Sequence, residues 1–134
     1  MSVSVIIPTL NEASCLAETL RSLRGEQPHQ VLVVDGGSTD GTCDLVSAPA
    51  RLLHAPPGRA LQMNHGAAQA SGDVLLFLHA DCTLEEGALE AAEVALGRRR
   101  VVAGCFQMRV DAAALAYRLI EACASARVRL TGLV

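Results

Sequence analysis

The sequence lacks an apolar run long enough to cross a membrane, and it has no basic run longer than Arg98-Arg99-Arg100. A membrane-spanning helix needs about 20 mainly apolar residues, so we expect no transmembrane segment. The formal net charge of −3 argues against nucleic acid as the main partner. Ser2 and Ser4 interrupt the apolar start of the chain, a pattern that does not predict a secretory signal peptide.

Cysteine pairs with the spacing of metal or redox motifs are also missing. The chain has five cysteines, and no two of them have Cys-x-x-Cys spacing. An odd number at irregular spacing predicts neither a disulfide framework nor a zinc knuckle. We therefore expect free thiols in a reducing cytoplasm, where each cysteine acts mainly as a small buried apolar side chain.

The composition of the 134 residues, 51% hydrophobic and 19% charged, is typical of a folded domain. The sequence shows no repeat, low-complexity segment or linker, so residues 1–134 are predicted to form a single domain. Apolar runs of strand length alternate with segments of helical spacing. Strands are predicted at residues 3–7, 31–35, 51–54, 74–78 and 101–110, and helices around residues 13–23, from about residue 40, at 61–68, from 83 toward 97, and at 112–130.

Several residues predict where these elements begin and end. Pro8 is expected to stop the first strand, and Gly25 is expected to end the first helix. The pairs Thr9/Glu12 and Thr83/Glu86 have capping-box spacing and predict the starts of two helices.

Strands that are apolar at nearly every position and are separated by helices predict an α/β fold, with a mostly parallel sheet covered on both faces. In such sheets, ligands bind beyond the carboxyl ends of the strands. Three polar segments follow predicted strands, namely PTLNE at residues 8–12, DGGSTDGT at 35–42 and HAD at 79–81. We expect these segments to meet at one edge of the sheet.

The second of these segments begins with Asp35, directly after a buried strand. A carboxylate there can accept hydrogen bonds from a nucleobase or a ribose hydroxyl, and Gly36 and Gly37 allow the backbone to approach a ligand closely. Residues 38–40 can then cap the next helix. The alternative is a glycine-rich turn between a strand and a helix, in which an aspartate serves only as a cap.

The third segment places Asp81 after the most hydrophobic strand. Its carboxylate can hold Mg²⁺ or Mn²⁺ while diphosphate oxygens complete the coordination shell. His79 is a candidate second ligand or a hydrogen-bond donor to phosphate. The alternative is that Asp81 caps a helix and His79 belongs to the edge of the core. Arg59, after Pro56-Pro57-Gly58, either reaches a diphosphate or is solvated.

In combination, the motifs are more specific than any one of them. The segments IIPTLNE, VVDGGSTDGT, GRALQMNHGAAQASGDVLLFLHAD and LEEGALE occur in this order. The chain resembles the family 2 glycosyltransferases, which have the nucleotide-sugar-binding, Rossmann-like GT-A fold. It looks most similar to the bacterial subgroup of radical-SAM/selenodomain-associated transferases of type 2, and the resemblance spans residues 3–134.

The resemblance implies an inverting transfer of sugar from a nucleotide-sugar donor to the hydroxyl group of an acceptor that we do not identify. It also implies a divalent metal, Mg²⁺ or Mn²⁺, held by Asp81, which matches the last position of the family's Asp-x-Asp motif, together with His79. The donor site implied by the resemblance comprises Pro8, Thr9, Leu10, Glu12, Asp35, Gly36, Gly37, Arg59, His79, Ala80 and Asp81.

The sequence departs from the family pattern at three places. Gly36 replaces a second aspartate found in many relatives, and His79 replaces the first aspartate of the metal motif. The family domain also continues beyond residue 134, and the part that follows carries the acceptor pocket and the general base. The sequence supplies no convincing base, because Asp111 and Glu121 have the character of solvated helix acids.

The sequence leaves two alternative functions to consider, and it also predicts an association with another chain. The chain could be a donor-binding module without turnover. A nucleotidyltransferase is disfavoured, because PTLNE lacks the basic, glycine-rich character of a phosphate loop. The apolar stripe of the predicted helix at 112–130 leads us to expect self-association, as a homo-oligomer, or docking of a partner through the last third of the chain.

Overall fold

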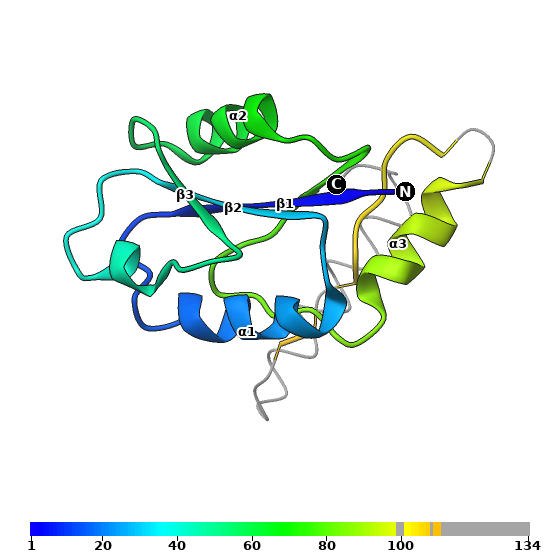
Figure 1. Ribbon diagram of the computed structural model, residues 1–134, viewed down its shortest axis with the longest axis horizontal. Coiled ribbons are helices and arrows are strands. Elements are labelled where there is room, and N and C mark those ends of the chain that lie inside the picture. Colours follow the sequence, from blue (N-terminus) through cyan, green and yellow to red (C-terminus); the bar gives the residue numbers. More distant parts are fainter. Residues whose placement is uncertain (99–100, 108, 111–134) are drawn as a thin grey trace. The chain divides into compact units, whose positions relative to one another are not determined.

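The computed structural model of the chain describes residues 1–98, 101–107, 109 and 110 (Figure 1). Contacts along the chain define one compact unit, Met1–Glu93, and a second unit, Val94–Val134. The predicted helix at 112–130, with Asp111 and Glu121 beside and within it, lies outside the described residues.

The first unit contains a four-stranded sheet with the order β3-β2-β1-β4, and every neighbouring pair of strands is parallel. The strands are β1 (Val3–Thr9), β2 (Gln30–Asp35), β3 (Arg51–His54) and β4 (Val74–Phe77). The helices are α1 (Leu16–Glu26), the short 3-10 helix η1 (Thr42–Leu45), α2 (Arg59–Gln69) and α3 (Ala88–Leu96). The predicted α/β class with a parallel sheet is therefore confirmed. Because all four strands run the same way, their carboxyl ends lie at one edge.

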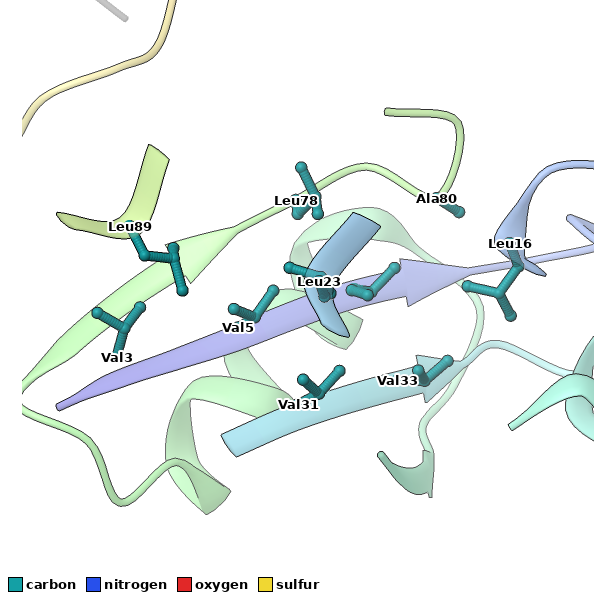
Figure 2. Packing of buried hydrophobic residues seen from close by; sticks show 10 residues of the cluster. Val3, Val5, Leu16, Leu23, Val31, Val33, Leu78, Ala80 and Leu89 are labelled. Atoms are coloured by element: carbon teal, nitrogen blue, oxygen red, sulfur yellow. The ribbon is translucent and has the colours of Figure 1, made fainter. Parts of the chain in front are cut away.

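Helices cover both faces of the sheet, as predicted, with α1 on one face and α2 on the other (Figure 1). Alternate strand residues point to opposite faces, so Val3, Val5 and Ile7 pack with Leu16 and Leu23 of α1. Figure 2 shows this cluster, to which β2, the segment after β4 and α3 also contribute. The opposite face carries a smaller buried cluster of Ile6, Leu32 and Val34, with Ala67 of α2 packed against it.

A glycine allows α2 to lie close to the sheet. A Cβ atom built on Gly66 would lie 2.5 Å from Cγ2 of Ile6 and 3.0 Å from Cγ2 of Val34. Real Cβ atoms do not approach other carbons this closely, so the spacing between α2 and the sheet requires glycine at this position.

The first strand continues through Pro8, where the sequence predicted its end. Pro8 pairs with Val34 of β2, and the pairing of β1 with β4 ends at Ile6 and Phe77. Alternate residues direct their backbone groups to opposite sides, and the Ile6 carbonyl oxygen accepts from Leu78 N on the β4 side. The backbone nitrogen of Pro8 therefore faces the β4 side, where the pairing with β4 has already ended. Proline at this position removes no hydrogen bond from the sheet.

Both predicted capping boxes are wrong. Thr9 belongs to β1, and α1 begins only at Leu16. Helix α1 also continues through Gly25, and Gln27 is the residue with positive φ, 48°, at its C-terminal cap. Local spacing could not show these outcomes, because strand pairing holds Thr9 in an extended conformation.

The second predicted cap is replaced by a contact from a distant segment. Helix α3 begins at Ala88. The carboxylate of Glu26, at the end of α1, accepts hydrogen bonds from the backbone N–H groups of Gly87 and Leu89 at 2.7 and 2.8 Å. Glu26 thus satisfies free N–H groups at the start of α3, the task that the sequence assigned to Thr83 and Glu86.

Two other predicted boundaries differ from the structure. The helix expected from about residue 40 is the short η1, and β4 ends at Phe77 rather than Leu78. The strand predicted at 101–110 is absent from residues 101–107, 109 and 110, which are mostly exposed. The β-branched and apolar residues there favour a strand, but a strand also requires a neighbour that completes its hydrogen bonds.

Candidate functional site

Two loops at the carboxyl edge of the sheet bind each other through side-chain hydrogen bonds. The loop after β1 donates Asn11 N to the hydroxyl of Ser38 at 2.8 Å, and the Asn11 side-chain oxygen accepts from Thr39 N at 2.9 Å. Asn11 has a positive φ of 57°, which asparagine tolerates better than most residues. The segments PTLNE and DGGSTDGT are therefore joined, as the sequence predicted.

The same two loops are joined again closer to η1. Glu12 N donates to the hydroxyl of Thr42 at 2.9 Å, and Ala13 N donates to Asp40 Oδ2 at 3.0 Å. The other oxygen of Asp40 accepts from Thr42 N at 3.0 Å. Asp40 therefore holds the first residue of η1 and the loop that precedes α1 at the same time.

Asp35 ends β2, and only 2% of its surface is exposed. Its Oδ2 atom accepts from the backbone N–H groups of Gly37 and Ser38 at 2.8 and 2.9 Å, and its Oδ1 atom accepts from the Ser38 hydroxyl at 2.5 Å. Gly37, with φ of 101°, is exposed at the top of this turn. The carboxylate thus shapes the glycine turn from inside.

These hydrogen bonds decide the charge of Asp35. Burial opposes ionisation of the carboxyl group, but hydrogen bonds from Ser38, Gly37 and Cys43 outweigh that effect and lower its pKa below the ordinary value. Asp35 is therefore ionised at neutral pH despite its burial.

Gln62 of α2 connects the ends of β1 and β2 on the other face of the sheet. Its buried amide nitrogen donates to the carbonyl oxygens of Thr9 and Val34, at 2.7 and 2.8 Å. A Cβ atom on the buried Gly36 would lie 3.1 Å from the Gln62 amide nitrogen. Gln62 therefore occupies the space beside Gly36.

The third polar segment follows β4. Ala80 is buried, and its carbonyl oxygen accepts from the Thr19 hydroxyl of α1 at 2.6 Å. His79 and Asp81 on either side of it are exposed. Both lie beyond the end of β4, so the alternation of strand residues does not determine their relative orientation. Asp81 Oδ1 accepts from the Cys82 thiol at 3.5 Å.

Charged groups at this edge shift the pKa values of two cysteine thiols. Burial, the neighbouring Glu12 carboxylate and the charge of Asp81 together raise the pKa of the Cys15 thiol. Burial and Asp81 raise the pKa of Cys82, whereas the positive charge of Arg59 acts on the same thiol in the opposite direction. Asp81 and Arg59, the first residue of α2, therefore both act electrostatically on thiols at this edge of the sheet.

The remaining residues of the predicted site lie at the same edge with different exposure. Thr9 is buried and its hydroxyl lies 3.4 Å from Asp35 Oδ1, whereas Pro8 and Glu12 are partly buried. Leu10 is 45% exposed, so it offers an apolar surface to the solvent at this edge.

Sequence reasoning expected Gln62 to form hydrogen bonds within the fold, which the structure confirms, but it missed Asn11 and Thr42 as organisers of this edge. Polar residues that form hydrogen bonds across 28 to 53 positions of sequence carry no local signal. Only Asn11 could have been noticed, because asparagine is common at positive φ and its position after a strand is typical of a turn.

Two groups of side chains could hold a cation. Asp81 is exposed, and it presents carboxylate oxygen of the type that Mg²⁺ and Mn²⁺ bind, so it fits the expected metal. A second group consists of Asp35, Cys43 and His54, whose ligand atoms all lie within 4.8 Å of one another. His54 had no predicted partner, and its Nδ1 atom lies 3.9 Å from Asp35 Oδ2.

Residues 4–127 match the model of glycosyl transferase family 2, and the chain belongs to this family. The chain is 38% identical over 93 residues to the PGL/p-HBAD biosynthesis glycosyltransferase of Mycobacterium bovis, an alignment that covers 62% of this chain and 36% of that protein. The chain thus spans about a third of the length of the curated relatives that it matches.

Solved structures agree with this assignment. The structure of residues 1–349 of S. aureus TarS matches with a TM-score of 0.63 and 30% identity, covering 72% of this chain and 32% of that one. Glucosyl-3-phosphoglycerate synthase of Mycobacterium tuberculosis, in complex with Mn²⁺, UDP and phosphoglyceric acid, matches with a TM-score of 0.56 and 25% identity. The match covers 61% of this chain and 34% of the synthase chain. The fold is therefore of the GT-A type, as predicted.

Among the residues that the structure describes, no helix has the length and apolar character required to span a bilayer.

Proposed function

We propose that this chain binds a nucleoside-diphosphate sugar and forms part of an enzyme that transfers the sugar, with inversion, to a hydroxyl group of an acceptor. The observation that carries this proposal is the meeting of three polar segments at one edge of a parallel sheet. Asp81 follows β4 and Arg59 begins α2 after β3, so both lie in segments that follow strands at the carboxyl edge of the sheet. An anionic diphosphate at this edge would therefore have an acidic metal ligand and a guanidinium group as candidate partners.

The two interlocked loops are proposed to hold the nucleoside. Leu10 would offer its exposed apolar surface to the base, with Pro8, Thr9 and Glu12 forming that wall. Gly36 and Gly37 would form the opposite wall, kept in shape by the buried Asp35. Asp35 would thus support the pocket mainly through the turn that it shapes, because its oxygens already accept hydrogen bonds from Gly37 and Ser38.

The proposed cation is Mg²⁺ or Mn²⁺, with Asp81 as the ligand, His79 as a second ligand and Ala80 between them. When bound, such an ion would offset the negative charge that develops on the leaving diphosphate. Arg59 would bind the same phosphates by charge-assisted hydrogen bonds. The Mn²⁺ and UDP in the solved structure of the M. tuberculosis synthase support this choice of probe.

We propose that the general base lies outside the residues described by the structure. Of the carboxylates near the joined loops, Asp35 and Asp40 accept backbone hydrogen bonds and Glu12 accepts from the Cys15 thiol at 3.2 Å. The chain alone would then bind donor but transfer sugar slowly. Its proposed place is the bacterial subgroup of radical-SAM/selenodomain-associated transferases of type 2, in the cytoplasm.

Calorimetry with UDP and GDP, each with Mn²⁺ or with EDTA, tests donor binding. We expect binding that requires Mn²⁺ and is lost in Asp81→Asn. Asp73→Asn is the matched control, because Asp73 precedes β4 at the opposite edge and binds the backbone and hydroxyl of Ser2. Equal heats with Mn²⁺ and with EDTA, or no heat with either nucleotide, would contradict the proposal.

Turnover separates an enzyme from a donor-binding module. Release of nucleoside diphosphate from a nucleotide sugar identifies catalysis, whereas metal-dependent binding without release identifies a module.

A further inference from the structure

We propose that Asp35, Cys43 and His54 form a binding site for a divalent cation of the zinc type, separate from the Mg²⁺ or Mn²⁺ position proposed at Asp81. The three residues come from the end of β2, from η1 and from the end of β3. Each offers a different ligand atom, a carboxylate oxygen, a thiol sulfur and an imidazole nitrogen, and these atoms lie within 4.8 Å of one another.

The sheet itself creates this arrangement. Asp35 and His54 are direct partners in the parallel pairing of β2 with β3, so both side chains lie on the same face. The crossover between these strands contains η1 and brings Cys43 to that face. The sequence separates the three residues, and the register of one strand pair brings them together.

The one ligand pair with a defined separation, His54 and Asp35, is close to what a zinc ion requires. Zinc binds oxygen, nitrogen and sulfur at about 2.0 to 2.3 Å in tetrahedral sites, so its ligand atoms lie roughly 3.5 Å apart. The Nδ1 atom of His54 is 3.9 Å from Asp35 Oδ2, close to that separation. The His54 side chain is 70% exposed and can rotate toward the other two, and its exposure also leaves a path for the ion.

The types of ligand select the class of ion. Mg²⁺ prefers oxygen ligands alone, whereas a set of sulfur, nitrogen and oxygen suits Zn²⁺ or Co²⁺. Three protein ligands would leave a fourth coordination position open. The backbone N–H groups of Gly37 and Ser38 already orient the Asp35 carboxylate, in the manner of outer groups that fix a metal ligand.

The order of the strands separates the two cation positions. The triad lies at the ends of β2 and β3, and Asp81 follows β4 at the other side of β1. A zinc ion at the triad would draw together β2, η1 and β3 and would stabilise the turn that Asp35 shapes. The proposal concerns binding of the metal alone, so it stands or fails independently of nucleotide binding.

The experiment uses the whole chain, freed of metal, in the absence of nucleotide. Calorimetry with Zn²⁺ measures stoichiometry and affinity, and Co²⁺ serves as a spectroscopic probe whose charge-transfer absorption reports a bound thiolate. We expect one site, with the affinity for Zn²⁺ lowered at least about tenfold in Cys43→Ser and in His54→Asn. The Co²⁺ absorption should vanish in Cys43→Ser.

Two matched variants control for binding by other thiols and imidazoles. Cys105→Ser and His65→Asn alter an exposed cysteine and an exposed histidine elsewhere, and they should leave the Zn²⁺ affinity unchanged. Asp81→Asn should also leave it unchanged. Thermal unfolding verifies that each variant is folded, and the exposed His54 can be replaced without disturbing the core.

Native affinity in both Cys43→Ser and His54→Asn would overturn the proposal. An equal loss in Cys105→Ser would overturn it as well, because it would indicate adventitious binding to thiols in general. Binding that is lost in Asp81→Asn would assign the zinc to the other position and would also contradict the triad.

Discussion

The side-chain amide nitrogen of Gln62 lies 2.7 Å from the carbonyl oxygen of Thr9, to which it donates a hydrogen bond. The same nitrogen donates to Val34, so one residue of α2 joins the ends of the two central strands at the edge where ligands bind in folds of this type. The contact also links the interior of the protein to the walls of the proposed donor site.

Gln62→Met, which keeps the volume but removes the donor, should lower the free energy of unfolding by about 2 kcal/mol, because two buried carbonyl groups lose their shared partner. Gln69→Met, at the exposed end of the same helix, should change it little. Chemical denaturation of both variants measures the difference. Equal stability of the two would show that the Gln62 contacts contribute nothing net.

Gly66→Ala should destabilise the fold by about 1 to 3 kcal/mol, because its new methyl group would overlap Ile6 and force α2 away from the sheet. Gly25→Ala is the counterpart, since a Cβ there meets nothing within 4 Å and Gly25 lies inside α1. That variant should gain about 0.5 kcal/mol from helix propensity. The midpoints of thermal and of chemical unfolding should fall for Gly66→Ala and rise for Gly25→Ala. A loss of stability in both variants would contradict the packing described above.

Arg59→Gln should weaken binding of UDP by about tenfold while leaving the weaker binding of uridine unchanged, because a guanidinium at the start of α2 would contact phosphate and not the base. Arg51→Gln, which alters an exposed arginine at the opposite end of the sheet, is the control. Titrations with UDP and uridine provide the comparison. A parallel loss for both ligands would assign Arg59 to the fold or to the nucleoside instead.

The carboxyl group of Asp40 should titrate below its ordinary pKa of about 3.9, because hydrogen bonds from Thr42 and from Ala13 N favour the ionised form and lower the pKa. At pH values between the lowered pKa of the folded chain and the ordinary pKa, the unfolded chain then binds more protons than the folded chain. The stabilisation from Asp40 is therefore complete above the ordinary pKa and is lost as the pH falls through the lower, folded pKa.

NMR titration of the side-chain carboxyl carbon measures the pKa of Asp40 directly. Denaturation at a series of pH values should show that Asp40→Asn loses less stability on acidification than the native chain does. Asp35 and Asp73 also have lowered pKa values and are present in both proteins, so the difference isolates Asp40. A pKa at or above the ordinary value would contradict the hydrogen bonds assigned to this carboxylate.

The sequence alone was enough to predict the α/β class and the four strands of the parallel sheet, because these depend on apolar runs that recur along the chain, whereas the fifth strand predicted at 101–110 is absent from the described residues there. The family followed from the motifs at the strand ends. Runs such as Val31–Val34 are apolar at every position, which is typical of strands covered on both sides. The meeting of the loops after β1 and β2 also followed from topology, since parallel strands bring their carboxyl ends to one edge.

Other features depended on partners far away in the sequence. Thr9 has the spacing of a helix cap but lies in a strand, because pairing with β2 outweighs a local preference. The start of α3 is capped by Glu26, and the turn after Asp35 is held by hydrogen bonds that require its buried position. A local pattern cannot report which distant group will satisfy a backbone N–H.

The sequence by itself therefore determined the order and type of the four sheet strands and of helices α1, α2 and α3, since the spacing of apolar side chains is a property of the sequence. Only the tertiary structure decided how polar groups pair at the edge of the sheet. The register of β2 against β3 brings His54 beside Asp35, and the close approach of α2 at Gly66 brings Gln62 to Thr9. Hydrogen bonds and metal ligands act over about 2 to 4 Å, so they depend on packing distances that a one-dimensional pattern does not contain.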